Sequence, residues 1–445
     1  MSTFTDSYKI PALRKKMWFT FLILSVLVLL SLVPVPGIDH AGASAAVAKW
    51  GDAGELLNII SFQALGNVAV TSLGLYPFLI ASIIMQILTI AVPKLRAIAQ
   101  TGDAGTKIIT RYTRIAAVAG DIVFAVLYCV GMRNHVWTQL NYWVSICLAG
   151  LCLAAGAAFF GWCIELINTK GIGSGLVIVI LACIVRCIPD VIFDVYKRAS
   201  VINIPVAVLI AAGCAVVAVA LIVLVIWFDM GGKKLRIVFS KRTVGMKQYG
   251  MQNQVLPLKV AQAGTMPIVY SLAIMLLPAA IICLVMPEDT TNLFLLGFVN
   301  FKRSISFYII YAAFISLFTY LFAMIQFNPF DLSNQIKQNG GYIQGLRPGK
   351  QTAQYLMSLY KNFFIADTAF LVCVCLVPML LDLIPAITGI WYLGIVVCLL
   401  GGGFVELNSV LENGIETEEE KNKIAVKDRK KNKYAKEAPK SSIRR

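Results

Sequence analysis

Charge is what this chain has least of: Asp, Glu, Lys and Arg make up 14% of its 445 residues, whereas an average soluble protein has about 25%. Hydrophobic residues make up 58%, and the mean hydropathy is +0.77. Several uncharged apolar runs exceed the roughly 18 residues that a helix needs to cross a bilayer. The composition therefore excludes an ordinary soluble domain and indicates an all-α polytopic membrane protein.

The motifs that mark common enzymes and metal sites are missing too. The sequence has no HExxH, no GxSxG and no GxxxxGK[ST] motif, which removes the usual signatures of metalloproteases, hydrolases and phosphate-binding loops. Its two histidines, His40 and His135, are far apart in the chain, and its 11 cysteines lie in or near apolar segments without paired CxxC spacing. Such cysteines behave as small apolar residues. We therefore expect no catalytic residue, no metal and no cofactor.

Apolar runs at ten places predict ten membrane-spanning helices. The fifth is the weakest, because three charged residues and a proline follow its short core, 176–185. The predicted spans are residues 17–33, 72–92, 115–132, 142–164, 174–196, 203–228, 262–286, 305–326, 362–381 and 387–408. They divide the chain into an N-terminal half (1–198), a C-terminal half (199–411) and a charged tail (412–445) that we expect to be disordered.

The distribution of basic residues predicts the orientation. Of the 39 Lys and Arg residues, 32 fall in segments that the ten spans place on one side of the membrane. Basic loops concentrate on the cytoplasmic side, so both termini are predicted to be cytoplasmic. Without the fifth span, the basic loop 229–259 and the tail would face outward. The net charge of +16 then belongs to a cytoplasmic face suited to anionic lipid, nucleic acid or an acidic protein.

The N-terminus also shares features with a cleavable signal peptide. Basic residues precede an apolar run, and the small-residue stretch 41–48 follows it. The run 17–33 is longer than the apolar region of a usual signal peptide, however, and it ends in PVPGIDH rather than in small residues. We therefore predict that this segment is retained as the first span.

Irregular segments interrupt the apolar pattern in two regions. The stretch 56–78 is broken by glycines and a proline, so we expect a half-helix that dips into the protein, with an external loop as the alternative. The loops 229–259 and 327–361 are both basic and predicted on the same side. The first is expected to pair as a short hairpin, and the NGG and RPG turns of the second should fix a protruding tip. Together they predict a docking surface.

Three acidic residues fall within predicted spans: Asp121, Asp367 and Glu406. Ionisable side chains inside a membrane are rare and often mark an ion or substrate pathway. An ion-coupled secondary transporter is therefore one alternative. Asp121 and Asp367 lie near the inside ends of their spans, where a side chain can reach the membrane surface. That position weakens the transporter hypothesis.

Motifs along nearly the whole chain resemble the SecY family of protein-conducting channels. In the first half these are PVPGID (34–39), ALG (64–66), TSLGLYPFLIASIIMQILTIAVPKL (71–95), TRYTR (110–114) and KGIGSGLVIVI (170–180). In the second half they are LPLKVAQAGTMPIV (256–269) and FNPFDLSNQIKQNGGYIQGLRPGKQTAQYL (327–356). The combination of GIGxG with NGG and RPGK in one ten-span sequence is specific.

The resemblance implies two pseudo-symmetric five-helix halves around a central hourglass pore. Such a channel conducts unfolded secretory polypeptides across the cytoplasmic membrane of a bacterium and releases transmembrane segments into lipid through a lateral gate. A narrow aliphatic ring would exclude ions by dewetting and still yield around a polypeptide. Carried over by motif, the ring consists of Leu75, Leu79, Leu176, Ile180, Val269 and Ile395. The resemblance implies no enzymatic activity.

The resemblance also implies a plug and a gate. The plug, at about 57–70, would seal the outer funnel at rest, and the gate would open between spans two and seven. The residues assigned to the plug are Leu57, Ile60, Phe62, Leu65, Gly66 and Val70, and those assigned to the gate are Gln86, Ala261 and Gln262.

Partners follow from the same resemblance. Arg242, Lys247, Arg347 and Lys350 are implied to bind the ribosome or a SecA motor ATPase, since contacts with ribosomal phosphates need basic side chains. SecE-like and SecG-like small membrane subunits, signal peptides, nascent chains and the lipid bilayer are the other expected partners. A passive scaffold that only docks ribosomes would share these loops but have no pore.

The chain also departs from the family pattern. Val28 stands where an arginine is usual, Ala261 where a polar gate residue is usual, and Met246 and Lys247 where two arginines are usual. The plug shows SFQ at 61–63 instead of SGG. An accessory channel for a restricted set of substrates is therefore an alternative to the housekeeping channel.

Overall fold

The computed structural model describes residues 10–99, 101–136, 141–200, 204–239, 242–244, 247–249, 253–261, 263–285, 305–326, 329–338, 340–381 and 395–412. The predicted charged tail lies outside these residues, apart from Glu412 at the end of the last helix. The division into two halves near residue 198 stays a prediction.

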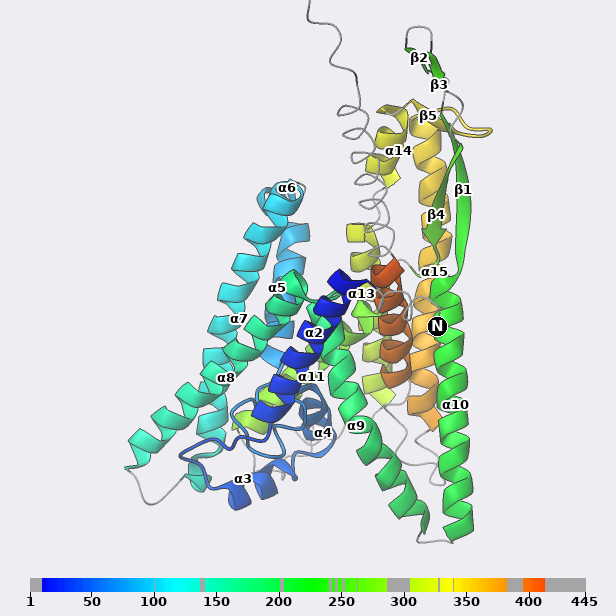
Figure 1. Cartoon of the computed structure of the whole chain (residues 1–445). Helices are drawn as coiled ribbons and strands as arrows, with labels where there is room; N and C mark the ends of the chain where they lie inside the picture. Colours follow the sequence, from blue (N-terminus) through cyan, green and yellow to red (C-terminus); the bar gives the residue numbers. More distant parts are fainter. Residues whose placement is uncertain are drawn as a thin grey trace, which may run out of the picture.

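A helix lies at each of the ten predicted spans (Figure 1). These are α2 (Pro11–Leu30), α5 (Tyr76–Ala91), α7 (Asp103–Gly131), α8 (Tyr142–Lys170), α9 (Gly175–Ser200), α10 (Ile204–Met230), α11 (Met266–Val285), α13 (Ile305–Gln326), α15 (Lys350–Leu381) and the last helix, Ile395–Glu412. In the described part of the chain, six helices are long and apolar enough to cross a membrane, or seven if the bent pair α5 and α6 (Pro93–Ala99) counts as one span. The helical multi-pass class is confirmed, and the number ten is consistent with the structure.

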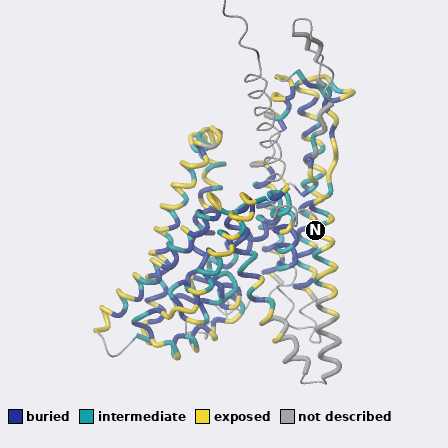
Figure 2. The backbone as a smooth tube through the Cα atoms, viewed as in Figure 1, coloured by how far each residue is buried: buried dark blue, intermediate teal, exposed yellow. Residues whose placement is uncertain are grey.

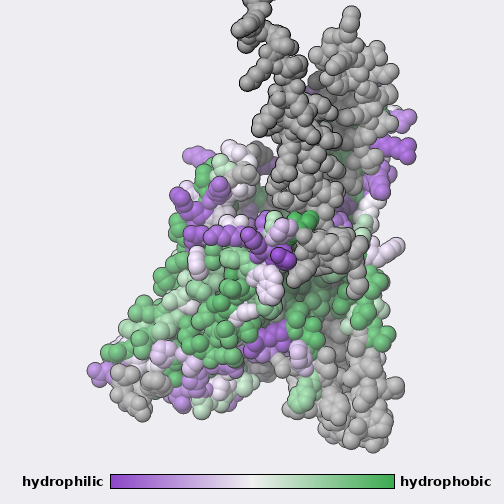
Figure 3. Space-filling view, in the orientation of Figure 1, coloured by the Kyte–Doolittle hydropathy of each residue, from purple (hydrophilic) through white to green (hydrophobic). Residues whose placement is uncertain are grey.

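Burial and hydropathy show where lipid would contact the protein. Buried residues fill the middle of the bundle, while the outward faces of the helices are exposed (Figure 2). Those faces form a broad hydrophobic band, with hydrophilic residues gathered above it (Figure 3). Trp18, Leu151 and Trp227 on these faces are 61%, 72% and 76% exposed. Continuous apolar exposure of this kind requires a lipid environment.

The broken segment is helical in a different place from the prediction. Its half-helix, α4, spans Gly51–Ile60, and residues 61–75 form consecutive turns before α5 begins at Tyr76. The predicted start of span two at residue 72 is therefore wrong. Gly74 has φ +53°, and a Cβ there would lie 2.5 Å from Ser61 Cα, so the chain turns tightly at this point. Pro77 then sits in the first turn of α5, where a missing N–H costs nothing.

The two basic loops fold into one sheet. β1 (Gly232–Phe239) and β4 (Asn253–Lys259) pair antiparallel, which confirms the predicted hairpin. β5 (Gly341–Ile343) comes from the second loop and pairs with the other edge of β1, giving the order β4-β1-β5. The short strands β2 (Arg242–Val244) and β3 (Lys247–Tyr249) pair beyond it. The sheet stands above the bundle, beside α14 (Pro329–Gln338) and the upper part of α15 (Figure 1).

A small core of its own holds this sheet together. Leu235 of β1, Leu258 of β4 and Ile343 of β5 pack with Leu356, which is fully buried on α15. Because α15 continues from this core into the apolar band, the sheet is fixed to the bundle through a helix of 32 residues. At the opposite end of the bundle, α3 (His40–Val47) packs beside the short helix η1 (Arg133–His135).

Candidate functional site

An apolar cavity of about 50 Å³ lies in the middle of the bundle. Four helices of the bundle and the half-helix α4 contribute to its wall, and every lining residue except Cys183 is aliphatic. The lining residues are Leu56, Ile59, Ile60, Leu75, Leu79, Ile180, Cys183, Ile184, Val269, Leu272, Ile395, Val396 and Leu399. A cavity of this size with no polar partners offers water no hydrogen bonds.

Five of the six side chains assigned to the ring line this one cavity: Leu75, Leu79, Ile180, Val269 and Ile395. The first and last of them, Leu75 and Ile395, are more than 300 positions apart in the chain. The five residues lie on or beside α5, α9, α11 and the last helix. The sixth, Leu176, is buried one turn before Ile180 on α9 and does not line it. The predicted ring residues therefore converge on one apolar cavity.

The half-helix α4 closes one side of the cavity. Leu56, Ile59 and Ile60 reach the cavity from it, and α4 packs against α9 and α11. Of the residues assigned to the plug, Leu57, Phe62 and Leu65 are buried, whereas Ile60, Gly66 and Val70 are half-buried. The predicted plug therefore lies directly against the predicted ring.

Local hydrogen bonds satisfy the backbone of the turns after α4. The Asn58 side chain accepts from the Gly66 amide at 2.8 Å, and its backbone carbonyl accepts from the Gln63 amide at 2.8 Å. The Ser72 hydroxyl donates to the carbonyl of Ala64 at 3.1 Å. These bonds replace a regular helix, which is how irregular backbone survives at membrane depth.

Longer-range contacts fix the same turns to the bundle. Val70 donates its amide to the Val33 carbonyl at 2.9 Å, in the segment after α2. The Phe62 and Phe160 rings lie 5.8 Å apart between centroids. The Val70 backbone approaches Gly156 of α8 very closely. A Cβ on residue 156 would lie 2.2 Å from the Val70 carbonyl oxygen, so only glycine fits there.

Two hydrogen bonds join α5 and α11, the helices predicted to flank the lateral gate. Gln86 Nε2 donates to Tyr270 Oη at 3.2 Å, and Tyr76 Oη donates to the Ala273 carbonyl at 3.0 Å. Sequence analysis assigned Gln86 but missed both tyrosines, because an isolated tyrosine in an apolar span gives no signal of its partner. Ala261 is buried ahead of α11, and Gln262 lies outside the described residues.

The basic tip of the second loop is exposed and well anchored. Arg347 and Lys350 are exposed, and the Thr352 hydroxyl donates to the Arg347 carbonyl at 2.9 Å. The Ser333 hydroxyl of α14 donates to the Gly349 carbonyl at 2.9 Å. Lys350 is the first residue of α15 rather than part of the turn.

The other two basic positions assigned to docking fall on the short strands beyond the sheet. Arg242 is in β2 and pairs in register with Tyr249. Lys247 is in β3 and pairs with Val244. The sheet and its extension therefore bring the backbones of both loops to the same end of the molecule (Figure 1).

Two of the three acidic residues of the predicted spans are buried within the protein, and Glu406 is half-buried. Asp121 and Asp367 are 2% and 1% exposed, so both carboxylates are enclosed by the protein, although their positions near the inside ends of the spans would allow a side chain to reach the membrane surface. Asp367 Oδ2 accepts from the Ala263 amide at 3.3 Å, ahead of α11. Lys259, at the end of β4, is a basic residue that interacts electrostatically with the carboxylates of both Asp229 and Glu406. The connection from β4 to α11 therefore has a basic group, Lys259, at its start and a carboxylate, Asp367, bonded to the Ala263 amide at its end.

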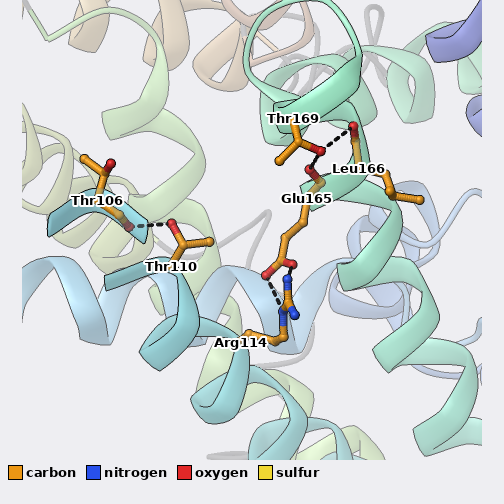
Figure 4. A network of polar contacts seen from close by, with 6 residues as sticks. All are labelled: Thr106, Thr110, Arg114, Glu165, Leu166 and Thr169. Atoms are coloured by element: carbon orange, nitrogen blue, oxygen red, sulfur yellow. Dashed lines mark hydrogen bonds and ion pairs between the residues drawn. The ribbon is translucent and has the colours of Figure 1, made fainter. Parts of the chain in front are cut away.

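An ion pair ties α7 to α8 (Figure 4). Arg114 Nε donates to Glu165 Oε1 at 2.9 Å, and the second guanidinium nitrogen pairs with Oε2. Glu165 is buried and Arg114 is 58% exposed. Sequence analysis noted the TRYTR motif but missed Glu165, which lies one residue beyond the predicted fourth span.

Comparisons with known proteins agree with this geometry. A model of the SecY family matches residues 69–401. The protein translocase subunit SecY of Thermotoga maritima is 31% identical over 391 residues, which cover 85% of this chain and 88% of that protein.

Two solved structures share the fold. The first is a structure of the SecY protein, whose plug domain is described as stabilizing the closed state of the translocation channel and maintaining a membrane seal. Its TM-score is 0.59 at 16% identity, covering 90% of this chain and 92% of that one. The other is Sec61 in the canine ribosome-channel complex from the endoplasmic reticulum, with a TM-score of 0.58 at 15% identity and the same coverage. The chain therefore belongs to the SecY family.

Proposed function

We propose that the protein is the central channel subunit of a Sec translocase in a bacterial cytoplasmic membrane. It conducts unfolded secretory polypeptides across the membrane and releases transmembrane segments sideways into lipid. The observation that carries this proposal is the aliphatic cavity, which collects five ring residues from four separate parts of the bundle and is closed by α4. The SecY relatives support the same function.

The aliphatic ring suits a substrate of any sequence. A pore that must pass every side chain cannot rely on charged groups or on ordered carbonyls, because each would trap some residues. Aliphatic side chains exclude hydrated ions by dewetting and can still move apart around a chain. The half-helix α4 would act as the plug that fills the space on the outer side of the ring.

The seam between α5 and α11 would act as the lateral gate. Only two hydrogen bonds join these helices directly among those of the described residues, Gln86 with Tyr270 and Tyr76 with Ala273. Hydrogen bonds between membrane helices contribute about 0.6 kcal/mol on average. A seam held by bonds of this strength can open when a sufficiently apolar segment takes their place.

The exposed sheet and the Arg347 tip would dock the machines that push polypeptide into the channel. The resemblance to a channel described in a ribosome complex supports the ribosome as one partner. A SecA motor, SecE-like and SecG-like subunits, signal peptides and nascent chains are the others. Both termini and the sheet would face the cytoplasm, and the concentration of basic residues on that side supports this orientation.

Planar-bilayer recordings test the proposal directly. The wild-type protein should be electrically silent, whereas a variant with residues 57–67 deleted should show flickering ion currents because the plug no longer covers the ring. If both remain silent although gel filtration shows folded protein and flotation with the vesicles shows insertion, the assignment of a plugged pore is wrong.

A further inference from the structure

Two cysteines of α9 contact the predicted plug at its sharpest turn. Cys183 Sγ donates to the Ile60 carbonyl at 3.5 Å, at the last residue of α4. Gln63 Nε2 donates to Cys187 Sγ at 3.9 Å. The cysteines are four residues apart, so they lie one above the other on the same face of α9. Both are buried, at 1% and 6% exposure.

The backbone between these two contacts is strained. Phe62 and Gln63 have φ of +56° and +61°, in the left-handed region that residues other than glycine rarely adopt. Such a conformation persists only where the surrounding structure holds it. Phe62 is fully buried and its ring packs near Phe160, and the two cysteines hold the backbone and side chain on either side of it.

Cys183 also lines the central cavity, as the one residue there that is not aliphatic. The same sulfur therefore faces both the passage and the plug. Displacement of α4 from the passage would break the Cys183 contact with Ile60 and the Cys187 contact with Gln63 together. A shift of α9 during widening of the ring would break the same two contacts.

We propose that Cys183 and Cys187 are positioning residues that hold the plug in its closed place against α9. This inference rests on the proposed function, because it needs α4 and the turns after it to act as a plug. Thiols suit the role: S–H is a weak donor and sulfur a weak acceptor. The contacts therefore hold the resting plug and still break when a polypeptide enters.

The inference predicts a rise in resting leak when the contacts are removed. In Cys183→Ala/Cys187→Ala, the fraction of time that the channel spends conducting should rise about five- to 25-fold, as expected for the loss of one to two net hydrogen bonds. Cys187→Ser keeps an acceptor for Gln63 Nε2 outside the cavity lining and should leave the channel as silent as the wild type. Cys129→Ala is the matched control, because Cys129 is also buried and its thiol contacts the Ile146 carbonyl at 3.8 Å, away from the plug.

Combining these substitutions with the deletion of residues 57–67 separates a plug contact from general loosening of the bundle. Without Ile60 and Gln63 the two cysteines have nothing to hold, so the double alanine variant should add no current to that of the deletion. All proteins are reconstituted after gel filtration, so that only folded channels are recorded.

Four results would overturn the inference. If the deletion leaks but Cys183→Ala/Cys187→Ala stays silent, the cysteines do not position the plug, and the proposed function stands. If Cys129→Ala leaks equally, or if the alanines add current to the deletion, the effect is a loosened bundle. If the deletion itself is silent, the plug and this inference fail together.

Discussion

Tyr270→Phe should make the seam between α5 and α11 easier to open. The substitution deletes only the hydroxyl that accepts from Gln86 Nε2 at 3.2 Å. The ring of residue 270 keeps its neighbours Phe318 and Phe322, whose centroids lie 6.3 and 5.1 Å away. A change in gating would therefore report the hydrogen bond rather than a cavity in the core.

The magnitude follows from the strength of such bonds. A hydrogen bond between membrane helices is worth about 0.6 kcal/mol on average and about 1.7 kcal/mol at most. Because 1.4 kcal/mol is a factor of ten, ~1 kcal/mol shifts the opening equilibrium about fivefold. Tyr76→Phe deletes the bond to the Ala273 carbonyl at 3.0 Å and should act similarly. If the two sites are independent, the double variant should reach about 25-fold.

Signal segments of graded hydrophobicity provide the assay. Proteoliposomes with each variant are given a series of precursors whose signal segments lose one leucine at a time, and translocation is scored by protease protection. Both tyrosine variants should accept segments less apolar than the wild type accepts. Tyr311→Phe, which removes another fully buried tyrosine hydroxyl on α13, should leave the threshold unchanged. An unchanged threshold in both gate variants, at normal translocation of strong signals, would refute the assigned role of these bonds.

Three further predictions concern the ring, the tip and the connection to α11. Ile180→Asn should raise the resting ion current about tenfold or more in bilayer recordings, because an amide in the cavity gives water a hydrogen-bond partner. A variant that stays silent would contradict a dewetting ring. Arg347→Glu should weaken ribosome or motor binding in co-sedimentation at unchanged Tm. Lys337→Glu, a control that is also exposed but lies on α14, should leave binding unchanged. Equal losses of binding in the two variants would point to an effect of overall charge. Asp367→Ala should lower stability by about 1–3 kcal/mol in thermal unfolding, because the buried Ala263 amide loses its acceptor; an unchanged Tm would argue against a structural role for the carboxylate.

Much of the membrane architecture could be predicted from the sequence. Span positions depend on local composition, so the eighth predicted span, 305–326, coincides with α13. The hairpin in loop 229–259 also follows from a local pattern, and β1 and β4 pair as expected. The start of α5 was misplaced because the turns before it depend on Gly74 meeting Ser61, a contact between residues 13 positions apart.

The chemistry of the site was less accessible to sequence reasoning. An aliphatic residue in an apolar helix is the usual case, so the convergence of Leu79, Ile180 and Val269 on one cavity could be expected only through the family resemblance. The partners of Asp367 and Tyr270 are set by tertiary packing, and no local pattern announces them. Ala261 lacks the polar group usual at the gate, and the bond between Gln86 and Tyr270 supplies a polar contact on that seam instead.

The most direct test of the central claim is to find the polypeptide inside the ring. A photoreactive amino acid is placed at Ile180, which lines the cavity, or at Leu151, which is 72% exposed on α8, and a secretory precursor is stalled halfway across. The account predicts crosslinks to the precursor from residue 180 and none from residue 151. A stalled precursor that crosslinks equally at both positions, or only at residue 151, would contradict a path through the centre of this bundle.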